Sequence, residues 1–248
     1  MRQIFQPMTG TLAQLQRSPR DMARWQSAQQ ELLAGRHGAA LAGYQALAGR
    51  YPQVAQLWFE LGNAAAGELD FALANEAYRR AIALGPENSA LLVMIGKQFE
   101  ALRQLDDARA AYERAVAADP GSIDARISLA VWCEKERRFD QAWECVEACL
   151  ARQPGDDQAR YFKAFLLHRQ GRNAEAETAL RQLIADEPRY PYVKYASRHL
   201  LGVVLDQLGQ FQEAMRWLGE AKTLLRQITD VSLLEHSYDE ADRRRRQL

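Results

Sequence analysis

Residues 56–86, QLWFELGNAAAGELDFALANEAYRRAIALGP, decide the fold expected for this chain. Counted from Ala55 as position 1, the characteristic positions of this stretch hold Trp58 (4), Leu61 and Gly62 (7 and 8), Ala74 (20), Tyr78 (24), Ala81 (27) and Pro86 (32). Apolar residues on the buried side of paired helices account for such a pattern. It predicts two helices joined by a turn at Asp70.

The pattern resembles the tetratricopeptide repeat (TPR), a helix-turn-helix unit of 34 residues with Trp, Leu-Gly, Tyr, Ala, an aromatic residue, Ala and Pro in this order. One position departs from the family, because Ala65 stands where a Tyr is usual. The resemblance implies an all-α solenoid, since each TPR stacks on its neighbours.

The unit recurs along the chain. Five of the eight prolines are spaced 34 residues apart, at Pro52, Pro86, Pro120, Pro154 and Pro188. The alanine of position 20 recurs with them, at Ala40, Ala74, Ala108, Ala142 and Ala176. A sixth unit follows after a shift of four residues, with Leu201, Gly202, Ala214 and Ala221 at the matching positions. The insertion YPYVKY, residues 190–195, accounts for the shift and lengthens either the loop or the next helix.

The expected architecture is a right-handed superhelical solenoid of six TPR units, at residues 21–54, 55–88, 89–122, 123–156, 157–190 and 195–228. Residues 1–17 form an N-terminal arm, and the array starts at residue 18, where Ser18 caps a helix that begins with Pro19. Residues 229–248 form a C-terminal capping helix with Leu233, Leu234 and Tyr238 on one side.

Turn signals separate the two helices of each unit. Gly35, Gly171 and Gly209 are expected at helix ends, and Asp70, Asp106 and Asp140 as caps of the helix that follows. After the lattice prolines, Asn88 or Ser89, Ser122 and Asp156 are further cap candidates. The small residues of position 8 are expected to face those of position 20, so that the two helices approach closely.

Composition excludes several functional classes. The chain of 248 residues has 32 basic and 32 acidic side chains, so it lacks the positive charge that nucleic-acid binders need. Its N-terminus has no apolar run of signal-peptide length, and no stretch approaches a membrane span. We expect a cytoplasmic protein that contacts neither nucleic acid nor membrane. Cys133, Cys145 and Cys149 are interpreted as reduced thiols in small core positions.

No enzyme signature is present in the sequence: it has no phosphate-binding Gly-rich loop with Lys and Ser/Thr, no His-Glu-x-x-His, no Gly-x-Ser-x-Gly and no Cys-x-x-Cys. The four histidines are scattered, and Cys145 and Cys149, one helical turn apart, are weak evidence for metal ligation. We therefore expect a chain without catalytic residues, metal or cofactor.

In the TPR family, the first helix of each unit lines a concave face that holds partner peptides. Carried onto this sequence, the resemblance implies a partner-binding groove of Trp25, Gln29, Phe59, Asn63, Val93, Lys97, Ile127, Val131, Tyr161, Phe165, His168 and His199. A row of apolar and aromatic side chains on an open surface indicates a protein or peptide partner, either a helix or an extended segment.

Three alternatives stay open. The groove residues could be covered from within the chain, by the arm or by the terminal helix, or by a second copy in a homodimer. Residues 200–224 and the charged helix expected after them are also similar to the end of the repeat array in bacterial proteins where TPR units precede a sulfotransferase-like domain. The chain would then be the non-catalytic region of a larger enzyme. A self-associating structural oligomer is the third alternative.

Overall fold

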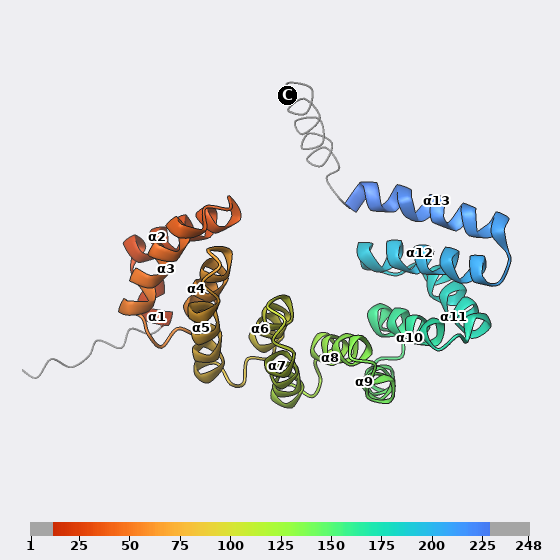
Figure 1. Cartoon of the computed structure of the whole chain (residues 1–248), viewed down its shortest axis with the longest axis horizontal. Helices are drawn as coiled ribbons and strands as arrows, with labels where there is room; N and C mark the ends of the chain where they lie inside the picture. Colours follow the sequence, from red (N-terminus) through yellow and green to blue (C-terminus); the bar gives the residue numbers. More distant parts are fainter. Residues whose placement is uncertain (1–11, 229–248) are drawn as a thin grey trace, which may run out of the picture. The chain divides into compact units, whose positions relative to one another are not determined.

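The computed structural model describes residues 12–228, and among these residues it contains helices and no strand (Figure 1). The helices are α1 (Leu12–Gln16), α2 (Pro19–Leu33), α3 (His37–Arg50), α4 (Ala55–Gly67), α5 (Phe71–Leu84), α6 (Ser89–Ala101), α7 (Leu105–Ala118), α8 (Ile123–Lys135), α9 (Phe139–Arg152), α10 (Asp157–Arg169), α11 (Asn173–Ala185), α12 (Pro191–Gln207) and α13 (Phe211–Ile228). The all-α class expected from the sequence is confirmed.

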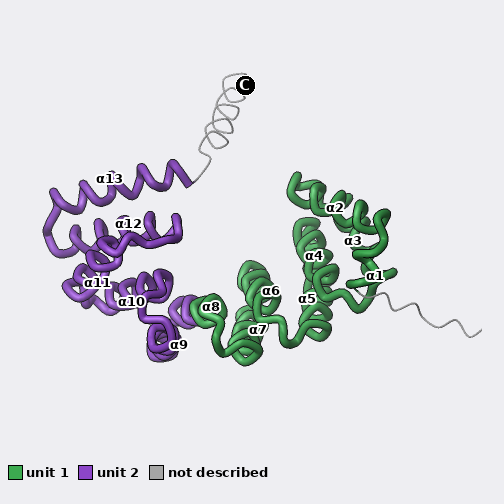
Figure 2. The backbone as a smooth tube through the Cα atoms, turned by 180° about the vertical axis from the view of Figure 1, so that it is seen from behind, with its two compact units in different colours: residues 1–129 green, residues 130–248 purple. Residues whose placement is uncertain are grey.

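The chain divides into two compact units, residues 1–129 and 130–248, coloured separately in Figure 2. In unit 1, α2 packs on α3, α4 on α5 and α6 on α7. In unit 2, α10 packs on α11 and α12 on α13. Consecutive hairpins also contact one another, α3 with α4 and α11 with α12. The predicted repeat bounds and the division into six repeats stay predictions.

Each unit has its own apolar core. In unit 1 the core includes Tyr44, Leu47 and Leu57, none of which is exposed to solvent. Leu15 of α1 belongs to this core, so the last part of the predicted arm packs on the repeats. In unit 2 Leu180 of α11 and Leu201 of α12 are the corresponding buried residues. Ile4, Phe5 and Met8 of the arm and the predicted capping helix 229–248 lie outside the described residues.

A residue with positive φ ends the first helix of several hairpins. Gly35, Gly171 and Gly209 have φ values of 72°, 76° and 78°, as expected for glycine at helix ends. The equivalent position is occupied by Leu69 (φ 63°), Arg103 (φ 61°) and Arg137 (φ 60°) in other hairpins. These three non-glycine residues adopt the left-handed conformation at an energetic cost, because their Cβ atoms approach the following carbonyl oxygen.

The helix caps correct part of the prediction. Ser18, Asp70, Asn88 and Asp156 are N-caps, and each side chain accepts a hydrogen bond from a backbone N–H of the first turn. Asp106 and Asp140 are not caps, since the N-caps of their helices are Gln104 and Arg138. The cap directly follows the residue with positive φ, so these two aspartates fall inside the first turn. There they face the positive end of the helix dipole.

The close approach of paired helices also involves a position that the sequence analysis did not assign to it. A Cβ atom added to Gly62 would lie 2.4 Å from the ring of Tyr78, and one added to Gly96 would lie 2.5 Å from the ring of Tyr112. In these two hairpins the tyrosine of position 24 therefore lies directly against the glycine of position 8. In the last hairpin position 20 does come near, since the added Cβ of Gly202 would lie 3.2 Å from the carbonyl oxygen of Ala214.

Candidate functional site

The predicted groove residues of unit 1 lie on α2, α4, α6 and α8, and two of them, Trp25 and Gln29, bind one carboxylate. Glu60 of α4 is buried, and its Oε2 accepts a hydrogen bond from the indole Nε1 of Trp25 at 2.5 Å. Its Oε1 accepts from the amides of Gln29, at 3.3 Å, and Gln56, at 3.0 Å. Trp25 is half-buried and Gln29 is exposed. These contacts fix α2 against α4.

Tyr44 lies on the core side of the same carboxylate. Burial is the main reason why the pKa of Tyr44 is raised, and the Glu60 carboxylate adds to the increase. The hydroxyl therefore stays protonated at neutral pH. The arrangement gives Glu60 a structural role between two hairpins, which sequence reasoning missed. A carboxylate inside the otherwise apolar stretch Leu57–Leu61 is the signal that could have indicated it.

Two predicted groove residues of unit 1 are buried and do not form an open surface. Phe59 is 7% exposed and its ring lies 6.1 Å from that of Tyr78, while Val93 is 1% exposed. Tyr78 reaches α6 as well, with an edge-on contact to Phe99 at 5.6 Å. Phe59 and Val93, which the TPR resemblance assigned to a partner-binding surface, are thus covered within the described chain.

The other residues predicted for the groove on α4, α6 and α8 are either polar or half-buried. Asn63 accepts a hydrogen bond of 2.9 Å from the Tyr78 hydroxyl, so its side chain is occupied within the hairpin. Lys97 is exposed. Ile127 in unit 1 and Val131 in unit 2, both on α8, are half-buried. Unit 1 therefore offers few exposed apolar groups on its predicted binding helices.

Unit 2 is different, because aromatic side chains gather on α10 and α12. Tyr192, Tyr195 and His199 follow one face of α12, with ring centroids 6.1 Å and 5.8 Å apart. Tyr161 and Phe165 lie one helical turn apart on α10, which contacts α12. We call these five residues the aromatic surface of unit 2.

The positions of Tyr192 and Tyr195 follow from the greater length of α12. The inserted residues before repeat six extend α12 backward by one turn, with Pro191 at its first position, where a missing N–H costs nothing. One extra turn keeps the helical phase, so Tyr192 and Tyr195 continue the row that His199 begins. The sequence predicted His199, Tyr161 and Phe165 for this surface but not Tyr192 and Tyr195. The high aromatic content of the insertion was the sequence feature that could have indicated these two tyrosines.

Solvent access varies across the aromatic surface. Tyr192 is 63% exposed and His199 is exposed, whereas Tyr161 and Phe165 are half-buried against the core of unit 2. The ring of Phe165 stacks on that of Phe162 at 5.5 Å. Burial raises the pKa of Tyr161, and the nearby Tyr192 and Tyr195 raise it further. Tyr161 is therefore a neutral hydroxyl beside two other tyrosines, able both to donate and to accept.

Polar residues border the aromatic surface at the end of α10. Nδ1 of His168 lies 3.0 Å from Oδ1 of Asn173, whose amide donates to Gln207 at 2.9 Å. Nε of Arg169 donates to the buried Glu134 at 2.5 Å. His168 of α10, expected in the groove, is therefore held by Asn173 at the start of α11.

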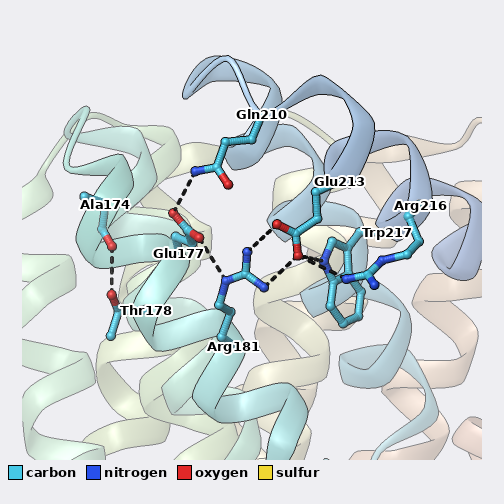
Figure 3. Close-up of polar contacts among 8 residues, drawn as sticks. All are labelled: Ala174, Glu177, Thr178, Arg181, Gln210, Glu213, Arg216 and Trp217. Atoms are coloured by element: carbon cyan, nitrogen blue, oxygen red, sulfur yellow. Dashed lines mark hydrogen bonds and ion pairs between the residues drawn. The ribbon is translucent and has the colours of Figure 1, made fainter.

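A cluster of polar side chains joins the last two hairpins to one another, as Figure 3 shows. Both terminal nitrogens of Arg181 donate to the two carboxylate oxygens of Glu213, at 2.9 and 2.8 Å. Nε of Arg181 donates to Glu177 at 2.9 Å. The hydrogen bonds from Arg181 to Glu213, with that from the indole of Trp217, lower the pKa of Glu213 to about 2. The pair joins α11 to α13 through a bidentate interaction, which is stronger than a single hydrogen bond.

Within residues 12–228, no group of three or more His, Cys, Asp or Glu side chains is placed to hold a metal ion. Among the same residues, no helix is both long and apolar enough to cross a bilayer. Cys133 and Cys149 are buried, as expected for small core residues, whereas Cys145 is only half-buried.

Stacked helical hairpins repeating every 34 residues define this chain as a TPR protein. Its particular family follows from comparison with family models: the chain belongs to the family described as "T7SS, ESX-1 secretion system protein EccA1, N-terminal domain", which matches residues 22–231. A search of curated protein sequences gives no match.

Solved structures support the fold. PilW, described as a type IV pilus biogenesis factor, is 17% identical with a TM-score of 0.61, over 83% of this chain and 94% of PilW. YrrB, described as a TPR protein with an unusual peptide-binding site, is 20% identical with a TM-score of 0.51, over 74% of this chain and 95% of YrrB. Yeast Tom70 is 16% identical with a TM-score of 0.57, over 88% of this chain and 43% of Tom70. These matches do not support the likeness to sulfotransferase-linked repeats.

Proposed function

We propose that this chain is a protein-interaction module and that the aromatic surface of unit 2 binds a segment of a partner protein. The observation that carries the proposal is the row of Tyr192, Tyr195 and His199 on α12, next to Tyr161 of α10. Tyr192 is 63% exposed although its ring belongs to a continuous aromatic group. Aromatic rings in this setting supply large contact areas at low entropic cost.

The chemistry of the surface indicates what the partner segment needs. Rings on α10 and α12 accommodate apolar anchors at their faces, and the tyrosine hydroxyls offer hydrogen bonds to backbone carbonyls or polar side chains. A segment with two or three apolar side chains and accessible carbonyl groups fits, either as an amphipathic helix or in extended form. Phe59 and Val93 do not enter the proposal, because both are buried.

The family supplies the class of partner. Its description refers to a secretion system protein, so we propose that the bound segment comes from another protein of a secretion system of this type. YrrB, a TPR protein described as having a peptide-binding site, supports the peptide-binding mode for this fold.

The partner can be identified with the whole chain as bait. A pull-down from cells that contain such a system is compared with the same experiment on the double variant Tyr192→Ala/Tyr195→Ala. Tyr190→Ala is a matched control, because Tyr190 is 45% exposed and lies just before α12 without a ring contact to the row. A partner that the wild type and the control retain and the double variant loses supports the proposal. A partner retained by all three would contradict it.

One observation also favours the non-catalytic part of a larger protein. The matched family is described as an N-terminal domain. The proposal that this chain is the repeat region of a longer protein is tested by reading the parent gene beyond Leu248. A stop codon directly after Leu248 would refute it.

A further inference from the structure

A carboxylate continues the aromatic row of α12. Tyr192, Tyr195 and His199 lie on one face of this helix, and Asp206 follows on the same face about two turns after His199. Asp206 is exposed, and it has no ion-pair partner within residues 12–228. At about 1.5 Å per residue, it lies about 16 Å from Tyr195 along the helix axis. The aromatic surface of unit 2 is thus continuous with an unpaired negative charge.

The basic side chains of α12 are directed to another side of the helix. Nε of Arg198 lies 3.6 Å from Oε2 of Glu220, so this side of α12 faces α13. Lys194 lies one turn before Arg198 on the same side. Neither residue shares the face of Tyr192 and Asp206.

The basic side chains of α10 are also placed elsewhere. Arg160 pairs with Asp186 at 2.6 Å, and Arg169 donates to the buried Glu134. Lys163 is two residues from Tyr161, which puts the two side chains about 200° apart around the helix. The described parts of α10 and α12 therefore leave the charge of Asp206 to be balanced by a partner.

Aromatic rings of this chain already bind cations in other places. The guanidinium of Arg80 lies 4.1 Å from the ring centroid of Trp58. A cation over the face of a ring is attracted by the π electrons, and the attraction grows as water is excluded. Within residues 12–228, no Lys or Arg contacts the rings of Tyr192 and Tyr195 in this way. Tyr192 is exposed, so the guanidinium group of a partner can reach its ring.

We infer that the aromatic surface of unit 2 recognises a basic segment, with one cation over the rings of Tyr192 and Tyr195 and a second cation beside Asp206. The inference rests on the proposed function of the same surface and adds the charge of the bound segment. The distance of about 16 Å along α12 sets the spacing of the two basic residues. They are about five positions apart in an extended segment and about eleven in a helix.

Apolar side chains between the two basic residues complete the segment. Val203 is half-buried and lies between His199 and Asp206 on the same face of α12. Phe165 of α10 is half-buried as well and belongs to the aromatic surface. The surface is therefore apolar in the middle, with sites for a cation towards both ends of the row.

A peptide display screen on the full chain tests the charge of the segment. Random segments long enough for either conformation are selected in parallel on the wild type, on Asp206→Lys and on Glu147→Lys. The last variant is the matched control, because Glu147 is exposed on α9 and has no ion-pair partner within residues 12–228. The wild type and the control should enrich segments with two basic residues, whereas Asp206→Lys should enrich segments with one.

Dissociation constants of one selected segment then test each contact. Asp206→Lys should weaken its binding by about fivefold, and Glu at the second basic position of the segment should restore the affinity in this variant alone. Tyr192→Leu/Tyr195→Leu keeps an apolar surface without ring faces. In this variant, Gln at the first basic position of the segment should therefore weaken binding less than it does in the wild type.

The outcomes separate this inference from the proposed function. Selected segments that need Tyr192 and Tyr195 but carry no excess of basic residues would overturn the inference and leave the proposed function standing. Basic segments that bind Asp206→Lys as tightly as the wild type would overturn the pairing with Asp206 and with it the inference. Segments that bind Tyr192→Ala/Tyr195→Ala equally well, or a screen that selects nothing, would contradict both.

Discussion

The hydroxyl of Tyr51 donates a hydrogen bond of 2.7 Å to the carboxylate of Asp21, and both residues are buried. Ser18 donates to the same carboxylate at 2.7 Å, and Nη1 of Arg50 lies 3.2 Å from its other oxygen. Asp21 thus connects the start of α2 to the end of α3. The hydrogen bonds from Tyr51 and Ser18 are the main reasons why the pKa of Asp21 is lowered.

Replacement of Asp21 by Asn should destabilise unit 1 by about 2 kcal/mol, the usual effect of losing hydrogen bonds to a buried charged group. The sign of the pH dependence follows from the lowered pKa. The stabilisation is complete above the pKa of an unfolded aspartate, about 3.9, and is lost as the pH falls through the lower pKa of the folded state. Urea unfolding at pH 7 and pH 3 should show a smaller difference between wild type and variant at pH 3. An equal difference at both pH values would be inconsistent with this role.

Gly62 has no room for a side chain, because an added Cβ would lie 2.4 Å from the ring of Tyr78. Gly62→Val should cost about 1–3 kcal/mol through overpacking. Gly49→Ala in α3 is the control: nothing lies within 4 Å of its added Cβ, and alanine should stabilise this helix by about 0.5–1 kcal/mol. Thermal melts of both variants check the pair, and a Gly62 variant as stable as wild type would refute the ring contact.

Leu69 adopts a φ of 63° although its side chain is 73% exposed. Leu69→Gly should therefore relieve backbone strain with little loss of packing and raise stability by about 0.5–1 kcal/mol. The equivalent Gly171, with a φ of 76°, provides the reverse experiment. Gly171→Leu should destabilise the protein. Denaturant midpoints that move in the same direction for both changes would disagree with the assigned conformations.

The Arg181–Glu213 contact predicts an unusually acidic carboxyl group. Glu213 should titrate near pH 2 in the wild type, whereas Arg181→Gln should return its pKa toward the ordinary value of about 4.3. Because the folded-state pKa is lowered, the contribution of this pair to stability exists above about pH 4 and disappears as the pH falls toward 2. Carboxyl NMR titration measures both values directly, and identical values in the two proteins would exclude the pairing.

The sequence predicted the local structure well where a single residue decides it. Ser18, Asp70, Asn88 and Asp156 cap helices as expected, because capping depends on one side chain and the next few backbone groups. The caps predicted at Asp106 and Asp140 were wrong by two residues. The turn before each helix ends with a residue of positive φ, Arg103 or Arg137, and without a glycine there the sequence did not indicate where the turn ends.

Packing between helices was harder to predict than the helices themselves. The contact of Gly62 with Tyr78 depends on how the ring lies in the hairpin, which the spacing of small residues does not specify. The burial of Phe59, whose ring lies 6.1 Å from that of Tyr78, depends on side-chain packing that the repeat pattern does not specify. Glu60 was missed for the same reason, because its partners Trp25 and Gln29 belong to another repeat.

The candidate site was predicted only in part. Tyr161, Phe165 and His199 follow from the repeat positions, whereas Tyr192 and Tyr195 come from an insertion outside the pattern. The insertion could lengthen a loop or a helix, and only the structure shows that it adds one turn to α12. That turn extends the aromatic row.

The affinity of the full chain for its partner segment, measured by calorimetry, tests the central claim most directly. Tyr192→Ala/Tyr195→Ala should weaken binding by about tenfold or more, equivalent to about 1.4 kcal/mol, while the helical circular dichroism and the affinity of the Tyr190→Ala control stay unchanged. An unaltered dissociation constant in a folded double variant would contradict binding at the aromatic surface of unit 2.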